Sequence, residues 1–83
     1  MSSPIYFKVT RLLTTGASSN IVGWTRACPD TKYQVSAEFS YDAGNWWITD
    51  KYSKYFTLNV ENTPAGSQYA FIVIYYDNRD GGI

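Results

Sequence analysis

The sequence contains no histidine and only one cysteine, Cys28, among its 83 residues. Without an imidazole, the chain cannot support Ser-His-Asp or Cys-His catalysis, a histidine-ligated zinc ion or a histidine pH switch. A lone cysteine cannot close a disulfide within the chain or build a thiolate metal site. We therefore expect a fold that depends on packing alone, with no metal and no cofactor, and with Cys28 buried.

Charge is also scarce, because charged residues make up 17% of the sequence and seven basic residues balance seven acidic ones. Soluble chains usually contain roughly 25% charged residues. The even balance removes the basic surface that binds nucleic acids and anionic membranes. We expect no nucleic-acid partner, and a surface whose Ser, Thr, Asn and Tyr groups suit hydrogen bonding to neutral ligands.

Long apolar segments are missing too. No stretch approaches the roughly 18 apolar residues of a membrane helix, and the N-terminal MSSPIYFKV lacks the basic start and apolar run of a secretory signal. We expect no membrane span, and a location that is cytoplasmic or reached by secretion without a classical signal peptide. The length indicates a single domain over residues 1–83, and so small a core favours a homo-oligomer.

What the sequence does contain is a two-residue periodicity of apolar and polar positions. This alternation predicts strands near residues 5–10, 33–41 and 55–60, and weaker ones at 20–26 and 45–49. The segment 69–76 (YAFIVIYY) has no polar alternation, which predicts a central strand covered on both faces. With no helical periodicity, we predict an all-β domain: a small antiparallel sandwich of about six strands with Greek-key connections, or alternatively a small β-barrel.

One short segment supports the sandwich. The residues ACPDTKYQV, at positions 27–35, resemble the turn that leads into a strand in fibronectin type III and other immunoglobulin-like domains. The resemblance implies that Tyr33 is a tyrosine corner, whose hydroxyl bonds back to the main chain. In those domains the motif lies near the C-terminal end, whereas here it lies at residue 33. It bears on architecture and implies no function.

The most unusual segment surrounds two adjacent tryptophans, Trp46 and Trp47. Neighbouring residues of a strand point to opposite faces, so we expect one indole in the core and the other outside. An exposed indole stacks on the apolar face of a sugar ring, and carboxylate and amide groups bind its hydroxyls. Alternatively, both rings are covered by the fold or by a protein partner. The hydrogen-bonding partners that we predict beside the indoles are Tyr41, Asp42, Asn45 and Asp50.

A second candidate lies after the last strand, where Asp77 and Asn78 begin a loop. They could contact sugar hydroxyls or, with main-chain carbonyls, calcium, or they could form a solvated turn. We expect a chain that is not an enzyme, because so short a domain rarely forms a cleft deep enough to raise the pKa of a catalytic acid.

The sequence thus predicts a carbohydrate-binding module or lectin. The alternative is a protein interaction or assembly module without a sugar ligand, and a third hypothesis is a membrane-active protein that uses Trp and Tyr at the interface.

Overall fold

The computed structural model describes residues 5–76, which form six strands and, within that range, no helix. The predicted all-β sandwich is confirmed. No helix in these residues is long and apolar enough to cross a membrane. The strands are β1 (Ile5–Leu12), β2 (Ser19–Gly23), β3 (Gln34–Phe39), β4 (Trp46–Thr49), β5 (Tyr55–Val60) and β6 (Tyr69–Tyr76).

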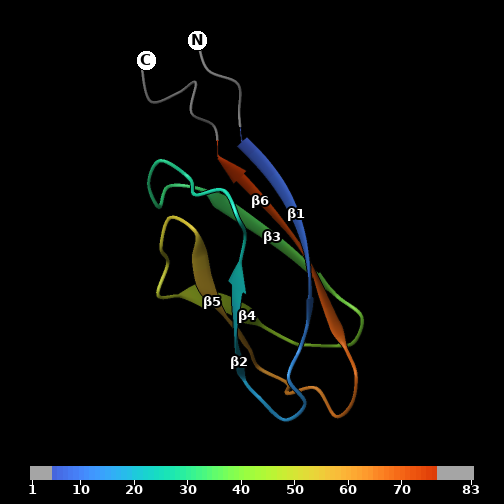
Figure 1. Cartoon of the computed structure of the whole chain (residues 1–83). Coiled ribbons are helices and arrows are strands. Elements are labelled where there is room, and N and C mark those ends of the chain that lie inside the picture. The colour runs from blue at the N-terminus through green and yellow to red at the C-terminus, as the bar shows by residue number, and fades with distance from the viewer. Residues whose placement is uncertain (1–4, 77–83) are drawn as a thin grey trace.

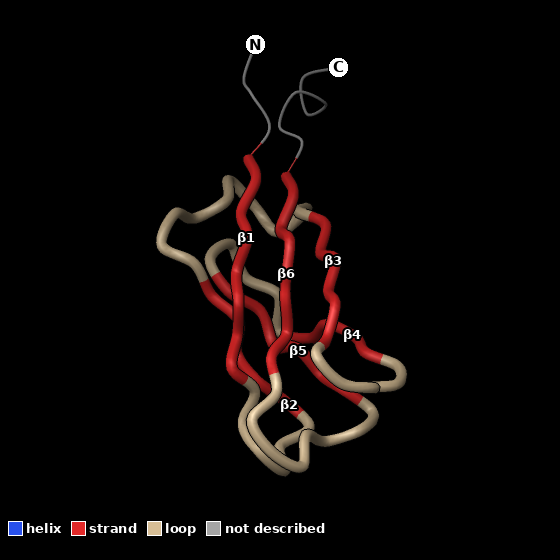
Figure 2. The backbone as a smooth tube through the Cα atoms, turned by 90° about the vertical axis from the view of Figure 1, so that its right-hand side faces the viewer, coloured by secondary structure: helices blue, strands red, loops and turns tan. Residues whose placement is uncertain are grey.

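The strands form two antiparallel sheets of three strands each, ordered β1-β6-β3 and β2-β5-β4 (Figure 1). In each sheet a strand from late in the chain separates two earlier ones, and only β4 and β5 pair as a hairpin of consecutive strands. Such non-consecutive pairing is what Greek-key connections produce. Figure 2 shows β6 between β1 and β3, with the second sheet behind them.

The core lies between the two sheets and follows from the alternation of each strand. Phe56 and Leu58 of β5 point inward, as do Ile72 and Ile74 of β6, and all four are at most 2% exposed. Burying side chains of this size contributes about 1.5–3 kcal/mol each. Cys28 is also buried, as the sequence predicted, and so is Trp24.

Tyr33 joins the two sheets. Its side chain is 1% exposed, and its hydroxyl donates to the carbonyl of Tyr52 at 2.6 Å, with the carbonyl of Tyr55 at 3.3 Å. The hydroxyl therefore bonds to the main chain, as the fibronectin-like resemblance implies. Its partners, however, lie in and after the β4–β5 loop of the opposite sheet, and not in the preceding turn.

The environment of β6 corrects one prediction. Its central position in the sheet is confirmed, and Ala70, Ile72 and Ile74 are buried. The alternate residues Tyr69 and Phe71 are 41% and 48% exposed, so within a single copy of the chain the predicted cover on both faces is wrong for these residues. A two-layer fold has only one interior, and therefore the outer face of even a central strand remains at the surface.

Candidate functional site

The candidate site is the outer face of the β2-β5-β4 sheet. Because Phe56, Leu58 and Val60 point into the core, the alternate residues of β5 point out. Strand pairing then places Trp47 beside Asn59, and Asn59 beside Ser19 on β2. The next row of the same face is Thr49, Thr57 and Ile21.

Trp46 and Trp47 lie on opposite faces of β4, as expected. Trp46 is half-buried and packs beside Phe39, with ring centroids 6.3 Å apart, against the core. Trp47 is 50% exposed on the outer face. The structure therefore assigns the outward position to Trp47, and the two indoles do not form one platform.

Asn59 occupies the middle of the outer face and holds the polar groups around it. Its amide nitrogen donates to the Thr49 hydroxyl at 3.0 Å, and its amide oxygen accepts from the Ser19 hydroxyl at 2.8 Å. The Thr49 hydroxyl accepts this bond and keeps its own proton to donate, while the Ser19 hydroxyl keeps acceptor capacity. A fixed row of hydroxyl and amide groups thus lies beside the Trp47 indole.

Two exposed tyrosines lie at the end of the sheet where β4 and β5 are connected, Tyr52 in the loop and Tyr55 at the start of β5. The Tyr52 and Tyr55 rings are 4.8 Å apart at 32°, and the two residues are 50% and 41% exposed. The Tyr52 N–H donates to the Tyr55 carbonyl at 2.8 Å, which closes the turn. Tyr55 lies four residues from Asn59 along β5, which is about 13 Å at the rise of a strand.

Three of the predicted polar partners lie in the β3–β4 loop, where hydrogen bonds fix the backbone. The Tyr41 hydroxyl donates to the Asn62 carbonyl at 2.5 Å, and an Asp42 carboxylate oxygen accepts from the Gly44 N–H at 3.1 Å. The Asn45 N–H donates to the Glu61 carboxylate at 2.9 Å. The bonds of Tyr41 and Asn45 join the loop to the turn after β5. Together with the Asp42 bond, they fix the backbone that leads into β4.

The other predicted partners lie elsewhere. Asp50 is exposed directly after β4 and has a φ of +48°, in the left-handed region that few residues other than glycine adopt. Asp77 and Asn78 lie outside the described residues. The structure thus brings Trp47 onto a shared face with residues that the sequence analysis did not select: Ser19, Ile21, Thr49, Tyr52, Tyr55, Thr57 and Asn59. Only the register of the strand pairs, which the alternation alone does not specify, would have identified them.

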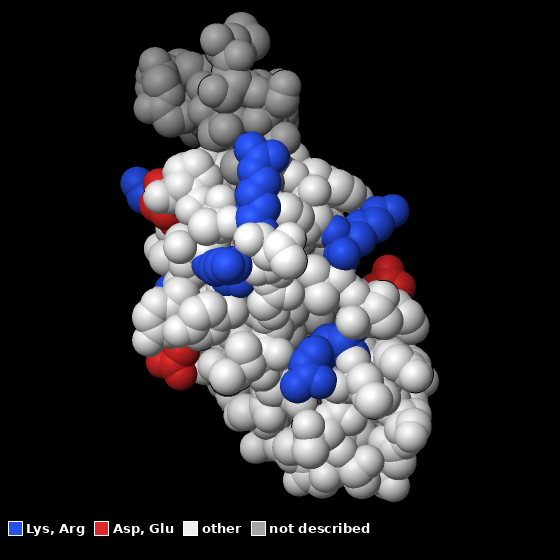
Figure 3. Space-filling model, in the orientation of Figure 1, with Lys and Arg blue, Asp and Glu red and all other residues white. Residues whose placement is uncertain are grey.

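The outer face of the β2-β5-β4 strands carries no Asp, Glu, Lys or Arg among its described residues. Figure 3 views the sandwich from the side, where Lys, Arg, Asp and Glu side chains are dispersed and the lower end shows none. Within residues 5–76, no three His, Cys, Asp or Glu residues form a group that could hold a metal ion. Neutral hydrogen-bonding groups and aromatic rings therefore dominate the chemistry of the site.

The resolved pKa shifts concern groups away from this face. Burial raises the pKa of the Cys28 thiol, and the nearby Asp30 carboxylate raises it further. The Asp30 carboxylate accepts from the Lys32 N–H at 2.7 Å, which lowers its pKa. It also accepts from the Tyr76 hydroxyl at 3.0 Å, and this bond raises the pKa of that phenol. These groups secure the end of the molecule near β3 and β6 and contribute no charge to the Trp47 face.

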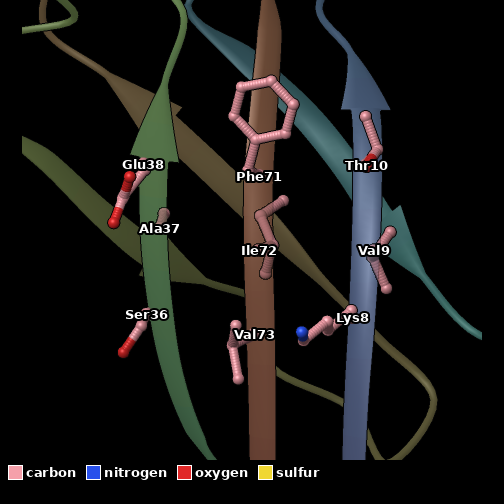
Figure 4. A pocket seen from close by; sticks show the side chains of 9 residues that line it. All are labelled: Lys8, Val9, Thr10, Ser36, Ala37, Glu38, Phe71, Ile72 and Val73. Carbon is pink, nitrogen blue, oxygen red and sulfur yellow. The ribbon is translucent and has the colours of Figure 1, made fainter.

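The opposite outer face, on the β1-β6-β3 sheet, contains a hollow of about 310 Å³. Its floor is formed by Val73, beside the larger Phe71, and its sides by Lys8 on β1 and by Ser36 and Glu38 on β3 (Figure 4). The hollow is open and shallow, and the two charged side chains lie on opposite sides of β6.

Comparisons of the chain with protein-family models, with curated proteins and with solved structures found no match.

Proposed function

We propose that the protein is a non-enzymatic carbohydrate-binding module whose binding site is the outer face of the β2-β5-β4 sheet. The observation that supports this most strongly is the exposed Trp47 indole beside a fixed row of uncharged hydrogen-bonding groups. The ring supplies an apolar surface for the C–H face of a sugar. Thr49 and Ser19, held by Asn59, supply directed hydroxyls for the sugar's hydroxyl groups.

The second aromatic group indicates the length of the ligand. The Tyr52 and Tyr55 pair lies at the other end of the same sheet face, about 13 Å along β5 from the row that contains Trp47. One sugar ring is too short to contact both groups. A ligand that uses the whole face is therefore an oligosaccharide or a polysaccharide chain lying along the sheet.

We propose binding without catalysis because of the residues on the same face. A glycosidase needs two carboxyl groups on either side of the scissile bond. The described strand residues of this face include none, and the nearest predicted acid, Asp50, lies beyond the end of β4. Binding without hydrolysis is the chemistry that these residues support.

The test is titration of oligosaccharides against wild-type protein and a Trp47→Ala variant, with tryptophan emission and calorimetry as readouts. Aromatic anchors at binding sites contribute about 2 kcal/mol, so we expect affinity to fall by about thirtyfold. Lys32→Ala is the control, because Lys32 is exposed in the loop between β2 and β3 and belongs to neither outer sheet face. Equal affinity of a folded Trp47→Ala variant would contradict the proposal.

A second candidate function is association with another protein, including another copy of the chain. The observation that favours it is the set of large exposed side chains on the β1-β6-β3 face, since exposed apolar surface marks interaction sites. These side chains are Tyr6, Leu12, Tyr69 and Phe71. Light scattering over a range of concentrations tests it. A mass that rises with concentration and falls in a Phe71→Ser variant supports association through this face, and a constant monomer mass excludes a homo-oligomer.

A further inference from the structure

The β1-β6-β3 outer face has an apolar spine along β6 with one charge on each side. Tyr69, Phe71 and Val73 follow one another along the spine. The strand register places Glu38 beside Phe71 and Lys8 beside Val73. The two charged side chains therefore lie on opposite sides of β6 and are offset by two residues along it, as Figure 4 shows.

We propose that this face docks on the same face of a second copy of the chain, related by a two-fold axis that runs along β6. This inference depends on the second candidate function and is independent of sugar binding. A two-fold interface uses one surface twice, so every contact between the copies occurs in duplicate. The axis along β6 places β1 of one copy over β3 of the other, and the two apolar spines over each other.

The charges select this axis. With β1 over β3, Lys8 lies over Ser36 of the partner subunit and diagonal to Glu38 of the partner subunit. The diagonal offset is about 7 Å along the strand, and facing sheets are about 10 Å apart, which extended lysine and glutamate side chains span together. An axis across the strands would instead place β1 over β1, with no opposite charge facing Lys8. The charge pattern thus complements itself in only one of these two arrangements.

The area of the face predicts how tight the dimer is. Two strands of eight residues and one of six, about 4.8 Å apart, form a face of roughly 350 Å², less than half of the roughly 800 Å² that each partner contributes to a standard interface. We therefore expect a weak dimer that dissociates on dilution. In this dimer the two Trp47 faces point away from each other, so that one dimer presents two sugar sites and gains avidity on a polymeric ligand.

The experiment is sedimentation equilibrium of wild-type and charge-reversed proteins over a range of concentrations. Lys8→Glu and Glu38→Lys each create two like-charge contacts in the dimer, and each should weaken association by about tenfold. A mixture of the two variants should restore association. The Lys8→Glu chain is negative at both position 8 and position 38, and the Glu38→Lys chain is positive at both, so every charged contact between the two chains joins opposite charges. Lys54→Glu, an exposed charge reversal away from this face, is the matched control and should leave the dimer unchanged.

The possible results distinguish association through this face from the orientation of the two-fold axis. Restoration in the mixture, with loss of the dimer in Phe71→Ser, supports both the face and the axis. A dimer that is lost in Phe71→Ser but insensitive to both charge reversals, or not restored by mixing, overturns the two-fold axis and leaves association through the face. A wild-type chain that stays monomeric at every concentration overturns both, and leaves the sugar-binding proposal standing.

Discussion

At the scale of single residues, the Tyr33 hydroxyl is the polar group whose removal is most informative. It is buried and bonds to the carbonyl of Tyr52, so Tyr33→Phe leaves a main-chain acceptor without its partner. An unsatisfied buried group costs about 1–3 kcal/mol. We expect the free energy of unfolding, measured with urea, to fall by that amount. An unchanged midpoint and slope would show that the bond between the sheets contributes nothing.

The same residue makes stability depend on pH in the alkaline range. Burial raises the pKa of Tyr33 to about 12, above its ordinary value of 10.0. Between these values the unfolded chain has lost the phenolic proton and the folded chain has kept it, so the unfolded state binds fewer protons and stability falls as pH rises. The expected loss is about 2 kcal/mol between pH 10 and pH 12.

Urea unfolding at a series of pH values measures this loss, and Tyr33→Phe is the control. The variant should show a shallower decline, although Tyr41, Tyr76 and Cys28, whose pKa values are also raised, still contribute to it. Identical slopes for the two proteins over this range would contradict the assignment to Tyr33.

The positions of the two adjacent tryptophans were predictable only in part from the sequence. That Trp46 and Trp47 occupy opposite faces follows from the geometry of any strand. Which of them faces outward depends on how β4 pairs with β5, and the sequence of β4 does not contain that register. Asn59 was missed for the same reason, because its role arises from Trp47, Thr49 and Ser19 on neighbouring strands.

At the scale of elements, the β3–β4 loop depends on a glycine in a left-handed conformation. Gly44 has a φ of +70°, and a Cβ there would lie 2.5 Å from the Glu61 carboxylate and 3.0 Å from the Asn62 amide. Gly16, in the β1–β2 loop, has a φ of +79° and open space around it. A residue with a side chain would therefore be strained at either position, but its Cβ would contact neighbouring atoms only at Gly44.

We expect Gly16→Ala to cost about 1 kcal/mol of stability, which is the strain of the left-handed conformation. Gly44→Ala should cost clearly more, because Glu61 must also move and its bond to the Asn45 N–H is disturbed. Thermal and urea unfolding of both variants measure the difference. Equal losses would mean that contact with Glu61 and Asn62 adds no cost to the backbone strain.

The elements themselves were largely predictable, because alternation is a local signal. The strand at residues 69–76 was placed at its observed ends, and the weaker strands were found but with bounds too long. The outer face of β6 was mispredicted, because Tyr69 and Phe71 are as apolar as buried residues and no local pattern distinguishes them. From the sequence alone, exposed apolar residues of a sheet face cannot be distinguished from core residues.

At the scale of the whole molecule, the sandwich presents two outer faces with different chemistry. The β2-β5-β4 face combines Trp47 with hydrogen-bonding groups and has no charged strand residue among those described. The β1-β6-β3 face combines an apolar spine with Lys8 and Glu38 on its two sides. This separation allows one face to bind a ligand while the other associates with a second copy. Neither face was predictable as a unit, because each assembles strands that are distant in the sequence.

Carbohydrate binding by the Trp47 face can be tested with a broad glycan array probed in parallel with labelled wild-type protein and the Trp47→Ala variant. We expect saturable binding of wild type to oligosaccharides of more than one ring, and loss of these signals in the variant while its circular dichroism spectrum remains that of a folded β protein. A blank array from folded wild-type protein, or signals that survive the substitution, would contradict binding by this face.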